Sequence, residues 1–235
     1  MHAARSVVLV TMLAACGDDG AGPVDAAPVP VDIDNGSCGD QIRFTGEYID
    51  WDSHKSFCGI NEAVIEVTGG SMDSTAPNGR FDLCIPDAAS TRLDVTQPTG
   101  VSQCTVPPAG YTIPTILFAQ KAVIHSGGFF SGRAFTTGRQ VALGVTLDPA
   151  KAHVFVHVDG TERTVSLAAP HGTAQAIRST AGSDWALVAQ GTDVFFPNVD
   201  VGTGTTMLTT DTAAIGTGSI PLVAGTLTNV SLKTN

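Results

Sequence analysis

Two histidines in one predicted strand are the first residues whose type and spacing suggest chemistry. His153 and His157 belong to the segment Ala-His-Val-Phe-Val-His-Val, where valines at alternate positions form the apolar stripe of a strand. Four strand residues separate the two histidine α-carbons by about 13 Å, whereas a metal ion binds ring nitrogens at about 2 Å. We therefore expect no metal site, but two half-exposed histidines opposite a core stripe of Val154, Val156 and Val158.

The chain lacks the local motifs of familiar catalytic sites. It contains no His-Glu-x-x-His zinc motif, and Ser131 in Gly-Phe-Phe-Ser-Gly stands in the wrong frame for a nucleophile turn. Asp211 is followed by Thr-Ala instead of the Thr-Gly of aspartic proteases, and no second copy completes a carboxylate pair. We therefore predict no catalytic residue and no cofactor, although a site assembled from distant loops would leave no local motif.

Trp51 and Trp185 are the candidate ligand-binding residues. Aromatic ring faces pack well against pyranose rings, so these two side chains would form a stacking platform for a sugar, together with Phe129, Phe130 and Phe195. Large aromatic side chains are more often buried in a core. The sequence alone leaves both interpretations open.

The composition favours a β protein and excludes nucleic acid as a partner. The 235 residues are 43% hydrophobic and only 14% charged, with 26 glycines and 13 prolines, which is typical of short strands joined by tight turns. The net charge of −10 repels phosphate backbones, and no basic stripe offsets that repulsion. Nothing in the composition indicates an oligomeric state.

The N-terminal residues have the layout of an export signal. His2 and Arg5 provide a weakly basic start, residues 7–15 form an apolar run too short to span a membrane, and Cys16 follows small residues. Residues 16–37 are rich in aspartate, glycine, proline and alanine and have no apolar periodicity. We expect this segment to be a disordered tether with a span of about 25 Å.

The junction Leu13-Ala14-Ala15-Cys16 resembles the lipobox of bacterial lipoproteins. In that family the signal peptide, here residues 1–15, is removed and the cysteine is lipidated. The resemblance therefore implies that Cys16 is lipidated and that the protein is attached to a membrane of the cell envelope through an N-terminal lipid. Gly17 stands where many lipoproteins of the inner membrane carry an aspartate, which favours the outer membrane. The alternative is an ordinary signal peptide with a chance cysteine near its end.

From Phe44 onward, short apolar alternations broken by turn residues predict an all-β fold. Asn78-Gly79 indicates a tight turn, and Phe81, Leu83 and Ile85 would share one face of a strand and enter a core. Strands of the first half are expected at residues 44–50, 62–68, 80–85 and 92–96.

Several segments of the first half follow one another in a recognisable order: Gly46-x-x-x-Asp50, Ala63-x-Ile65-x-Val67-x-Gly69, Thr75-x-x-x-Gly79-x-Phe81-x-Leu83-x-Ile85-Pro86 and Gly110-Tyr111. This order resembles the carboxypeptidase regulatory-like domain. Members of that family are transthyretin-like β-sandwiches, so the resemblance implies a first sandwich over residues 38–126.

Weaker echoes of the same pattern predict a second sandwich over residues 141–235. Gly144-Val-Thr-Leu-Asp148 echoes the first strand, and Val154-x-Val-x-Val-x-Gly160 echoes the second. The fold class is therefore all-β, with two tandem transthyretin-like sandwiches after the signal peptide and tether. One larger all-β domain is the alternative. Residues 127–140 fit neither sandwich and are assigned to a connecting segment, with a short helix or an ordered linker around 130–139.

Four cysteines beside the first predicted sandwich indicate two disulfides, since an exported chain reaches an oxidising compartment. If the second and third predicted strands pair as a hairpin, Cys58 lies near Cys84, which leaves Cys38 to pair with Cys104. Cys16 then remains for the lipid. A zinc site is disfavoured because the chain has no Cys-x-x-Cys and the cysteines are twenty or more residues apart.

The leading functional hypothesis is a lipid-anchored, non-enzymatic β-sandwich protein with a structural or interaction role at the cell envelope. Its partner would be a glycan or an envelope protein. The first alternative is a carbohydrate- or peptide-binding module that assists a separate enzyme. The second is an envelope enzyme of an unrecognised type.

Overall fold

The computed structural model describes residues 38–51, 58–98, 101–102, 109–136, 143–177 and 185–234. All of these residues belong to one compact unit of the chain. The predicted signal peptide and tether, the lipidation site Cys16 and the disulfide partner Cys104 lie outside the described residues. The described part is all-β, as predicted.

The described residues form eighteen strands and one short helix. No helix among them is long and apolar enough to cross a membrane. In chain order the elements are β1 (Ile42–Asp50), β2 (Val64–Val67), β3 (Met72–Ser74), β4 (Arg80–Ile85), β5 (Ser90–Thr96), β6 (Val101–Ser102), β7 (Ala109–Gly110), β8 (Thr115–Gln120), α1 (Lys121–His125), β9 (Phe130–Ala134), β10 (Ala152–Asp159), β11 (Arg163–Leu167), β12 (Gln175–Ile177), β13 (Trp185–Ala186), β14 (Gln190–Gly191), β15 (Asp193–Val199), β16 (Thr205–Thr210), β17 (Gly218–Pro221) and β18 (Leu227–Lys233).

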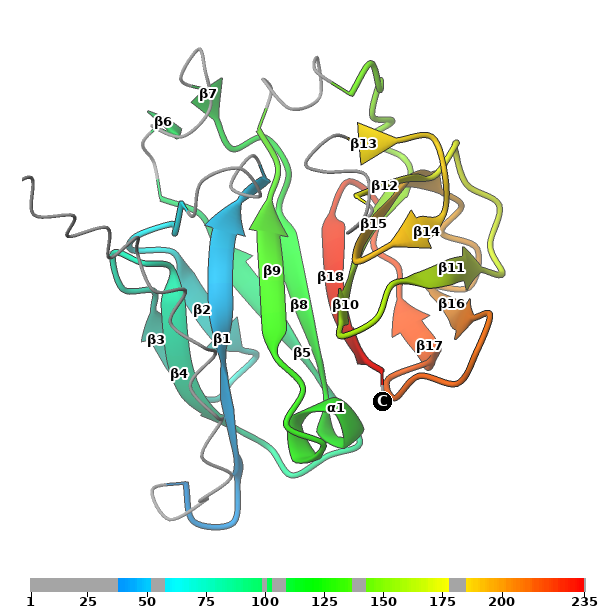
Figure 1. Ribbon diagram of the computed structural model, residues 1–235. Helices are drawn as coiled ribbons and strands as arrows, with labels where there is room; N and C mark the ends of the chain where they lie inside the picture. The colour runs from blue at the N-terminus through cyan, green and yellow to red at the C-terminus, as the bar shows by residue number, and fades with distance from the viewer. Residues whose placement is uncertain are drawn as a thin grey trace, which may run out of the picture. The chain divides into compact units, whose positions relative to one another are not determined.

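A nine-stranded sheet runs through the described part in the order β13-β12-β15-β10-β18-β8-β5-β2-β3 (Figure 1). Strand β18 lies between β10 and β8 and is parallel to both. Strands from both predicted sandwiches therefore share this sheet, and β18 joins them.

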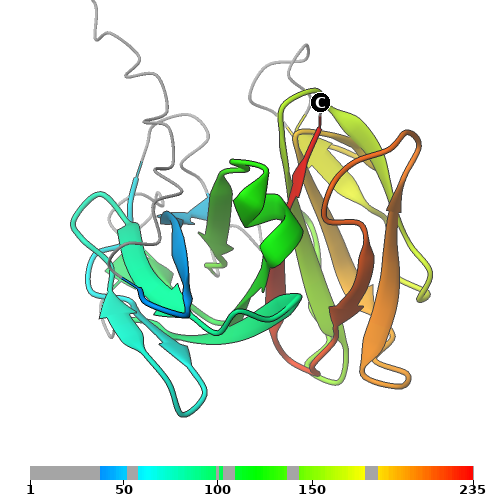
Figure 2. The same cartoon turned by 90° about the horizontal axis from the view of Figure 1, so that it is seen from below.

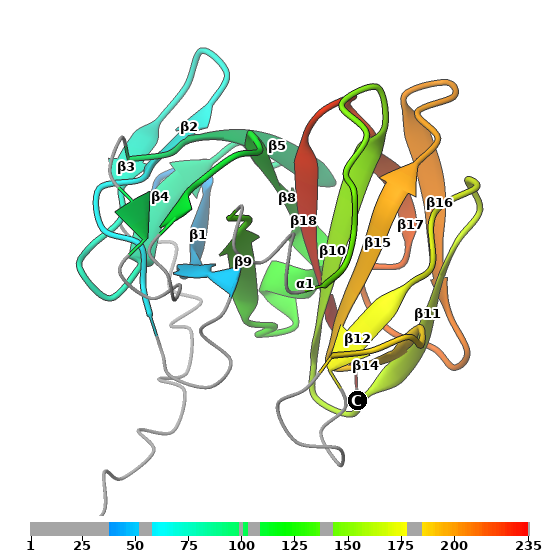
Figure 3. The same cartoon turned by 90° about the horizontal axis from the view of Figure 1, so that it is seen from above.

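Two smaller sheets cover opposite faces of the nine-stranded sheet (Figure 3). Sheet β4-β1-β9 packs over the first half, where Phe81, Leu83 and Ile85 are buried on one face of β4, as predicted. Sheet β14-β11-β16-β17 packs over the second half. Its core contains the predicted valine stripe of β10, formed by Val154, Val156 and Val158.

Two predictions about the middle of the chain are wrong. Residues 144–148 form no strand, and residues 130–134 form β9, which pairs in parallel with β1. The helix lies earlier, at Lys121–His125, beside β8 and β18 (Figure 2). The sequence of β9 places the polar Ser131 and Arg133 between Phe130, Gly132 and Ala134, yet all five residues are buried, so the polar side of the strand faces another layer and not solvent.

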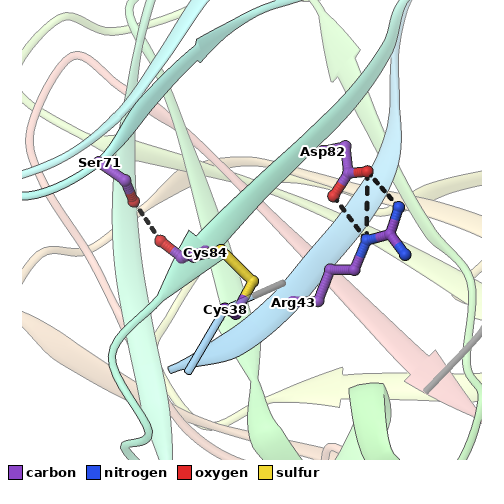
Figure 4. The surroundings of a disulfide bond; sticks show 5 residues. All are labelled: Cys38, Arg43, Ser71, Asp82 and Cys84. Atoms are coloured by element: carbon purple, nitrogen blue, oxygen red, sulfur yellow. Dashed lines mark hydrogen bonds and ion pairs between the residues drawn. A yellow bond between two sulfur atoms is a disulfide. The ribbon is translucent and has the colours of Figure 1, made fainter. Parts of the chain in front are cut away.

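The predicted disulfide pairing is also wrong, because Cys84 is bonded to Cys38 and not to Cys58 (Figure 4). Strand β4 pairs with β1, where Cys84 lies opposite Arg43, whereas β2 pairs with β3 and β5. Cys38 lies just before β1, so its α-carbon comes within 5.5 Å of that of Cys84. The expected Cys38–Cys104 bond is excluded as well. Cys58 is disulfide-bonded too. The cysteines left to pair with it are Cys16 and Cys104, and Cys104 is the expected partner if Cys16 carries the lipid.

Candidate functional site

The two candidate ligand-binding tryptophans meet in an aromatic cluster between the layers. Trp51, at the end of β1, is fully buried, and its ring stacks on that of Trp185 with centroids 5.2 Å apart. The rings of Phe135, Phe155 and Phe195 contact it edge-on at 4.9 to 5.1 Å. Trp51 is thus a core residue and not an exposed sugar platform. Trp185 is half-buried and covers it.

His153 is buried rather than half-exposed as predicted, with 1% of its surface accessible. Its Nδ1 accepts a hydrogen bond of 3.1 Å from the backbone N–H of Asn198. Burial lowers the pKa of His153 to about 4, and the nearby Asp148 only partly opposes this shift. Residues around Asp148 were expected to form a strand. Instead, Leu143 and Leu147 from this segment pack against the aromatic cluster.

His157 has an acidic partner that the sequence did not indicate. Its Nδ1 lies 2.7 Å from Oδ1 of Asp193, which stands directly opposite on β15. The side chain of His157 is 19% exposed, and that of Asp193 is 9% exposed. The two residues are 36 positions apart, and only the pairing of β10 with β15 brings them together.

Asp193 belongs to a chain of five polar residues that crosses from one layer to the other. An Nη atom of Arg133, on β9, lies 3.2 Å from Oδ2 of Asp193, and the other Nη donates to Ser131 Oγ at 3.2 Å. Ser131 donates in turn to Oε1 of Glu47, its neighbour on β1, at 2.8 Å. The order Glu47–Ser131–Arg133–Asp193–His157 places a cation between two carboxylates.

The charged side chains among these five residues compensate one another inside the protein. Burial alone would raise the pKa of Asp193, but Arg133 and His157 outweigh it and hold that pKa well below its usual range. The guanidinium carbon of Arg133 also lies 5.5 Å from the centre of the Phe155 ring, in a cation–π contact. Each member of the ion pair therefore has a further partner, His157 for Asp193 and both Ser131 and Phe155 for Arg133.

The arrangement resembles only part of a nucleophilic site. An aspartate that holds Nδ1 of a histidine orients the ring, but catalysis also needs a nucleophile on the other ring nitrogen. The nearest hydroxyl in the chain of contacts, that of Ser131, is held by Glu47 and Arg133. Among the described residues no group of three histidine, cysteine, aspartate or glutamate side chains is placed to hold a metal ion.

Side chains of β18 complete the free edge of β9. The backbone N–H of Arg133 donates to Oδ1 of Asn229 at 2.8 Å, and Nδ2 of Asn229 donates to the backbone oxygen of Arg133 at 3.2 Å. The N–H of Ser131 donates to Oγ of Ser231 at 3.3 Å. A buried strand edge needs partners for its backbone groups. Here an amide and a hydroxyl side chain take the place of a neighbouring strand.

The other edge of the same small sheet is treated in the same way. The N–H of Asp82, on β4, donates to Oδ2 of Asp73 at 2.9 Å, and the hydroxyl of Ser71 donates to the backbone oxygen of Cys84 (Figure 4). Both acceptor and donor side chains come from β3 or the turn before it. The three-stranded sheet is therefore joined to the nine-stranded sheet by side chains along both edges.

The exposed face of the other small sheet is rich in hydroxyl groups. Ser166 lies opposite Thr209, and Ser219 lies opposite Met207, whose surface is 49% exposed. An open hollow of about 440 Å³ adjoins this face. Its lining residues are Ala168, Ala169, Pro170, Asp200, Gly202, Thr203, Thr205, Thr206, Met207 and Ser219.

No family model, curated protein or solved structure matches this chain.

The buried His153 makes stability depend on pH. The folded state resists its protonation down to pH 4, whereas the unfolded chain takes up the proton near pH 6.5. The free energy of unfolding is therefore expected to fall as the pH drops from 6.5 towards 4, by roughly 2 kcal/mol between pH 7.5 and 5. Urea titrations at both pH values test this, and His153→Gln should remove most of the change. Replacing the exposed His125 by Gln should leave the change in place, and an unaltered slope in His153→Gln would contradict the assignment.

Removing one partner of the buried ion pair between Arg133 and Asp193 is expected to destabilise the fold strongly. Asp193→Asn leaves the buried guanidinium without its carboxylate, which should lower the free energy of unfolding by about 3–5 kcal/mol. Asp82→Asn is the matched control, since it removes an exposed carboxylate from Arg43 and should cost less than about 1 kcal/mol. Urea unfolding at pH 7, followed by tryptophan fluorescence, measures both. Equal losses in the two variants would show that the buried pair has no special role.

Proposed function

We propose that this protein is an exported, lipid-anchored β-sandwich protein of the cell envelope with a structural or interaction role. The observation that supports export most directly is the disulfide between Cys38 and Cys84, together with the bonded state of Cys58. Structural disulfides are typical of oxidising compartments outside the cytosol. Five cysteines cannot all pair, and the remaining one is available for a lipid.

The anchor would be Cys16, which follows the lipobox-like residues Leu13-Ala14-Ala15. Removal of residues 1–15 would leave the lipidated cysteine at the new N-terminus. Gly17, in place of an aspartate, favours the outer membrane as the site of the anchor. Residues 16–37 would then hold the β fold away from the lipid surface. Since the described fold begins at Cys38, the disulfide to Cys84 would fix the tether to β4 as well as to β1.

The finer fold proposal is a pair of transthyretin-like sandwiches that share their central sheet. Each half has its own core and its own covering sheet, which supports two sandwiches. The shared nine-stranded sheet supports their fusion into one body. This combination accounts for the sequence resemblance in the first half and for the weaker echo of it in the second.

An interaction role is supported by the hydrogen bonds that hold the side chains with catalytic potential, His157 and Ser131, inside the fold. His157 is held by Asp193, and Ser131 is held by Glu47 and Arg133. These groups join one layer to another, as expected of a scaffold. In β scaffolds of this kind the outer faces and loops carry the contacts with partners.

Mass spectrometry of the full-length protein from a Gram-negative host fed labelled palmitate tests the anchor. We expect the label on a chain that begins at Cys16, and Cys16→Ala should abolish it while leaving the disulfides intact. A non-reducing peptide map should contain Cys38–Cys84 and Cys58–Cys104. An unlabelled chain with a free thiol at Cys16 would refute the anchor, and a Cys58–Cys84 peptide would refute the pairing.

A neutral polysaccharide is the second candidate, supported by the hydroxyl-rich face of β11, β16 and β17. Its outward residues on these strands are all uncharged, although the chain carries a net charge of −10. Hydroxyl groups bind sugar hydroxyls as both donors and acceptors. This face, and not Trp51, is therefore the proposed sugar-binding surface. Its outward residues are Thr164, Ser166, Thr205, Met207, Thr209 and Ser219.

Pull-down on an insoluble β-glucan and on chitin tests the second candidate. Met207→Glu and Thr209→Glu each introduce a charge on the face and should weaken retention at least tenfold. Thr96→Glu, on an exposed strand position of the other half, is the matched control and should bind like the natural protein. Failure of the natural protein to bind either polysaccharide, or equal binding by all variants, would exclude this candidate.

A further inference from the structure

Strand β18 follows every other described strand in chain order, yet it occupies the centre of the nine-stranded sheet (Figure 1). It pairs with β10 over seven positions, from His153–Leu227 to Asp159–Lys233. On its other side it pairs with β8 over four positions, beginning at Thr115. Both pairings are parallel, and both join segments that lie far apart in the sequence.

The side chains of β18 enter all the layers of the fold. Leu227 belongs to the aromatic cluster, and Val230 and Leu232 belong to the core of the second half. All three are completely buried. On the face that meets the three-stranded sheet, Asn229 and Ser231 hold the edge of β9. On its opposite face Thr228 donates a hydrogen bond to the backbone oxygen of Pro221 in β17, so β18 contacts both smaller sheets through hydrogen-bonding side chains.

Without β18, neither half of the described fold has all the strands and core residues that it needs. Strands β8 and β10 would each present an unpaired edge in the middle of the sheet, and β9 would lose the partners of its backbone groups on the edge away from β1. Buried backbone groups without partners are strongly unfavourable. We propose that β18 controls folding, so that the preceding strands stay non-native until residues 227–233 are free to insert.

The dependence of folding on β18 would help an exported chain to stay unfolded during export, an argument that rests on the proposed function. A chain threaded through a membrane N-terminus first must remain extended, and here the strands that emerge early cannot close their sheets before residue 233 has emerged. Pairing of distant segments in parallel is also intrinsically slow, because large loops must close first. The topology would thus delay folding until translocation has passed β18.

Ribosome-bound full-length chains test the proposal without a membrane. The chain is extended after Asn235 by a stalling sequence with either a short linker, which keeps β18 in the exit tunnel, or a long linker, which frees it. Protease resistance and formation of the Cys38–Cys84 bond are measured under oxidising conditions. We expect digestion at least tenfold faster, and little correct disulfide, with the short linker. Equal resistance with both linkers would overturn the proposal.

Two variants of the long-linker chain show whether β18 itself is responsible. Val230→Pro blocks pairing within β18 and should be digested like the short-linker chain. Ala213→Pro, in an exposed loop, should resist like the natural long-linker chain. Resistance of Val230→Pro would also overturn the proposal. Because lipid plays no part in this assay, the folding proposal can fail while the proposed lipid anchor holds, and the reverse is also possible.

Discussion

The pair of hydrogen bonds between the side-chain amide of Asn229 and the backbone of Arg133 is the contact that fixes the three-stranded sheet to β18, the strand that joins the two halves. It replaces a neighbouring strand with one side chain, at 2.8 and 3.2 Å. Ser231 extends the same substitution to Ser131. Without these donors and acceptors the edge of β9 would be buried with unsatisfied backbone groups. With them, the three-stranded sheet lies against a strand of the second half.

Arg133 is fixed at its side chain as well as at its backbone. Asn229 holds the backbone to β18, and Asp193 holds the guanidinium to β15, so that β9 is tied to two strands of the nine-stranded sheet. A buried ion pair contributes little net stability compared with apolar packing, but the loss of one partner is costly. The pair therefore makes other positions of β9 unfavourable. A scaffold that must hold its outer faces and loops in fixed places benefits from such a constraint.

Local patterns predicted several of the strands, whereas the contacts of the candidate site depend on strands that pair across long distances in the sequence. The burial of Phe81 and Leu83 and the valine stripe of β10 follow from alternation within a few residues. The role of Asn229 could not be predicted, because Asn229, Ser231 and Lys233 stand at alternate positions, as on a solvent-facing side of a strand, and the partner of Asn229 lies 96 positions away. Cys84 was assigned the wrong partner for the same reason, since β4 pairs with β1 rather than with β2. For Trp51 the sequence left burial and ligand binding both open, because the residues that enclose it come from distant segments of the chain.

Amide hydrogen exchange of the natural full-length protein tests this account most directly. If the side chains of β18 make β9 part of the cooperative core, the amides of Ser131 and Arg133 should exchange only on global unfolding. Their exchange free energies should then equal that of Val156, in the middle of β10. Faster exchange of Ser131 and Arg133 by local opening, while β10 stays protected, would show that β9 separates from β18 in the folded state and would contradict the account.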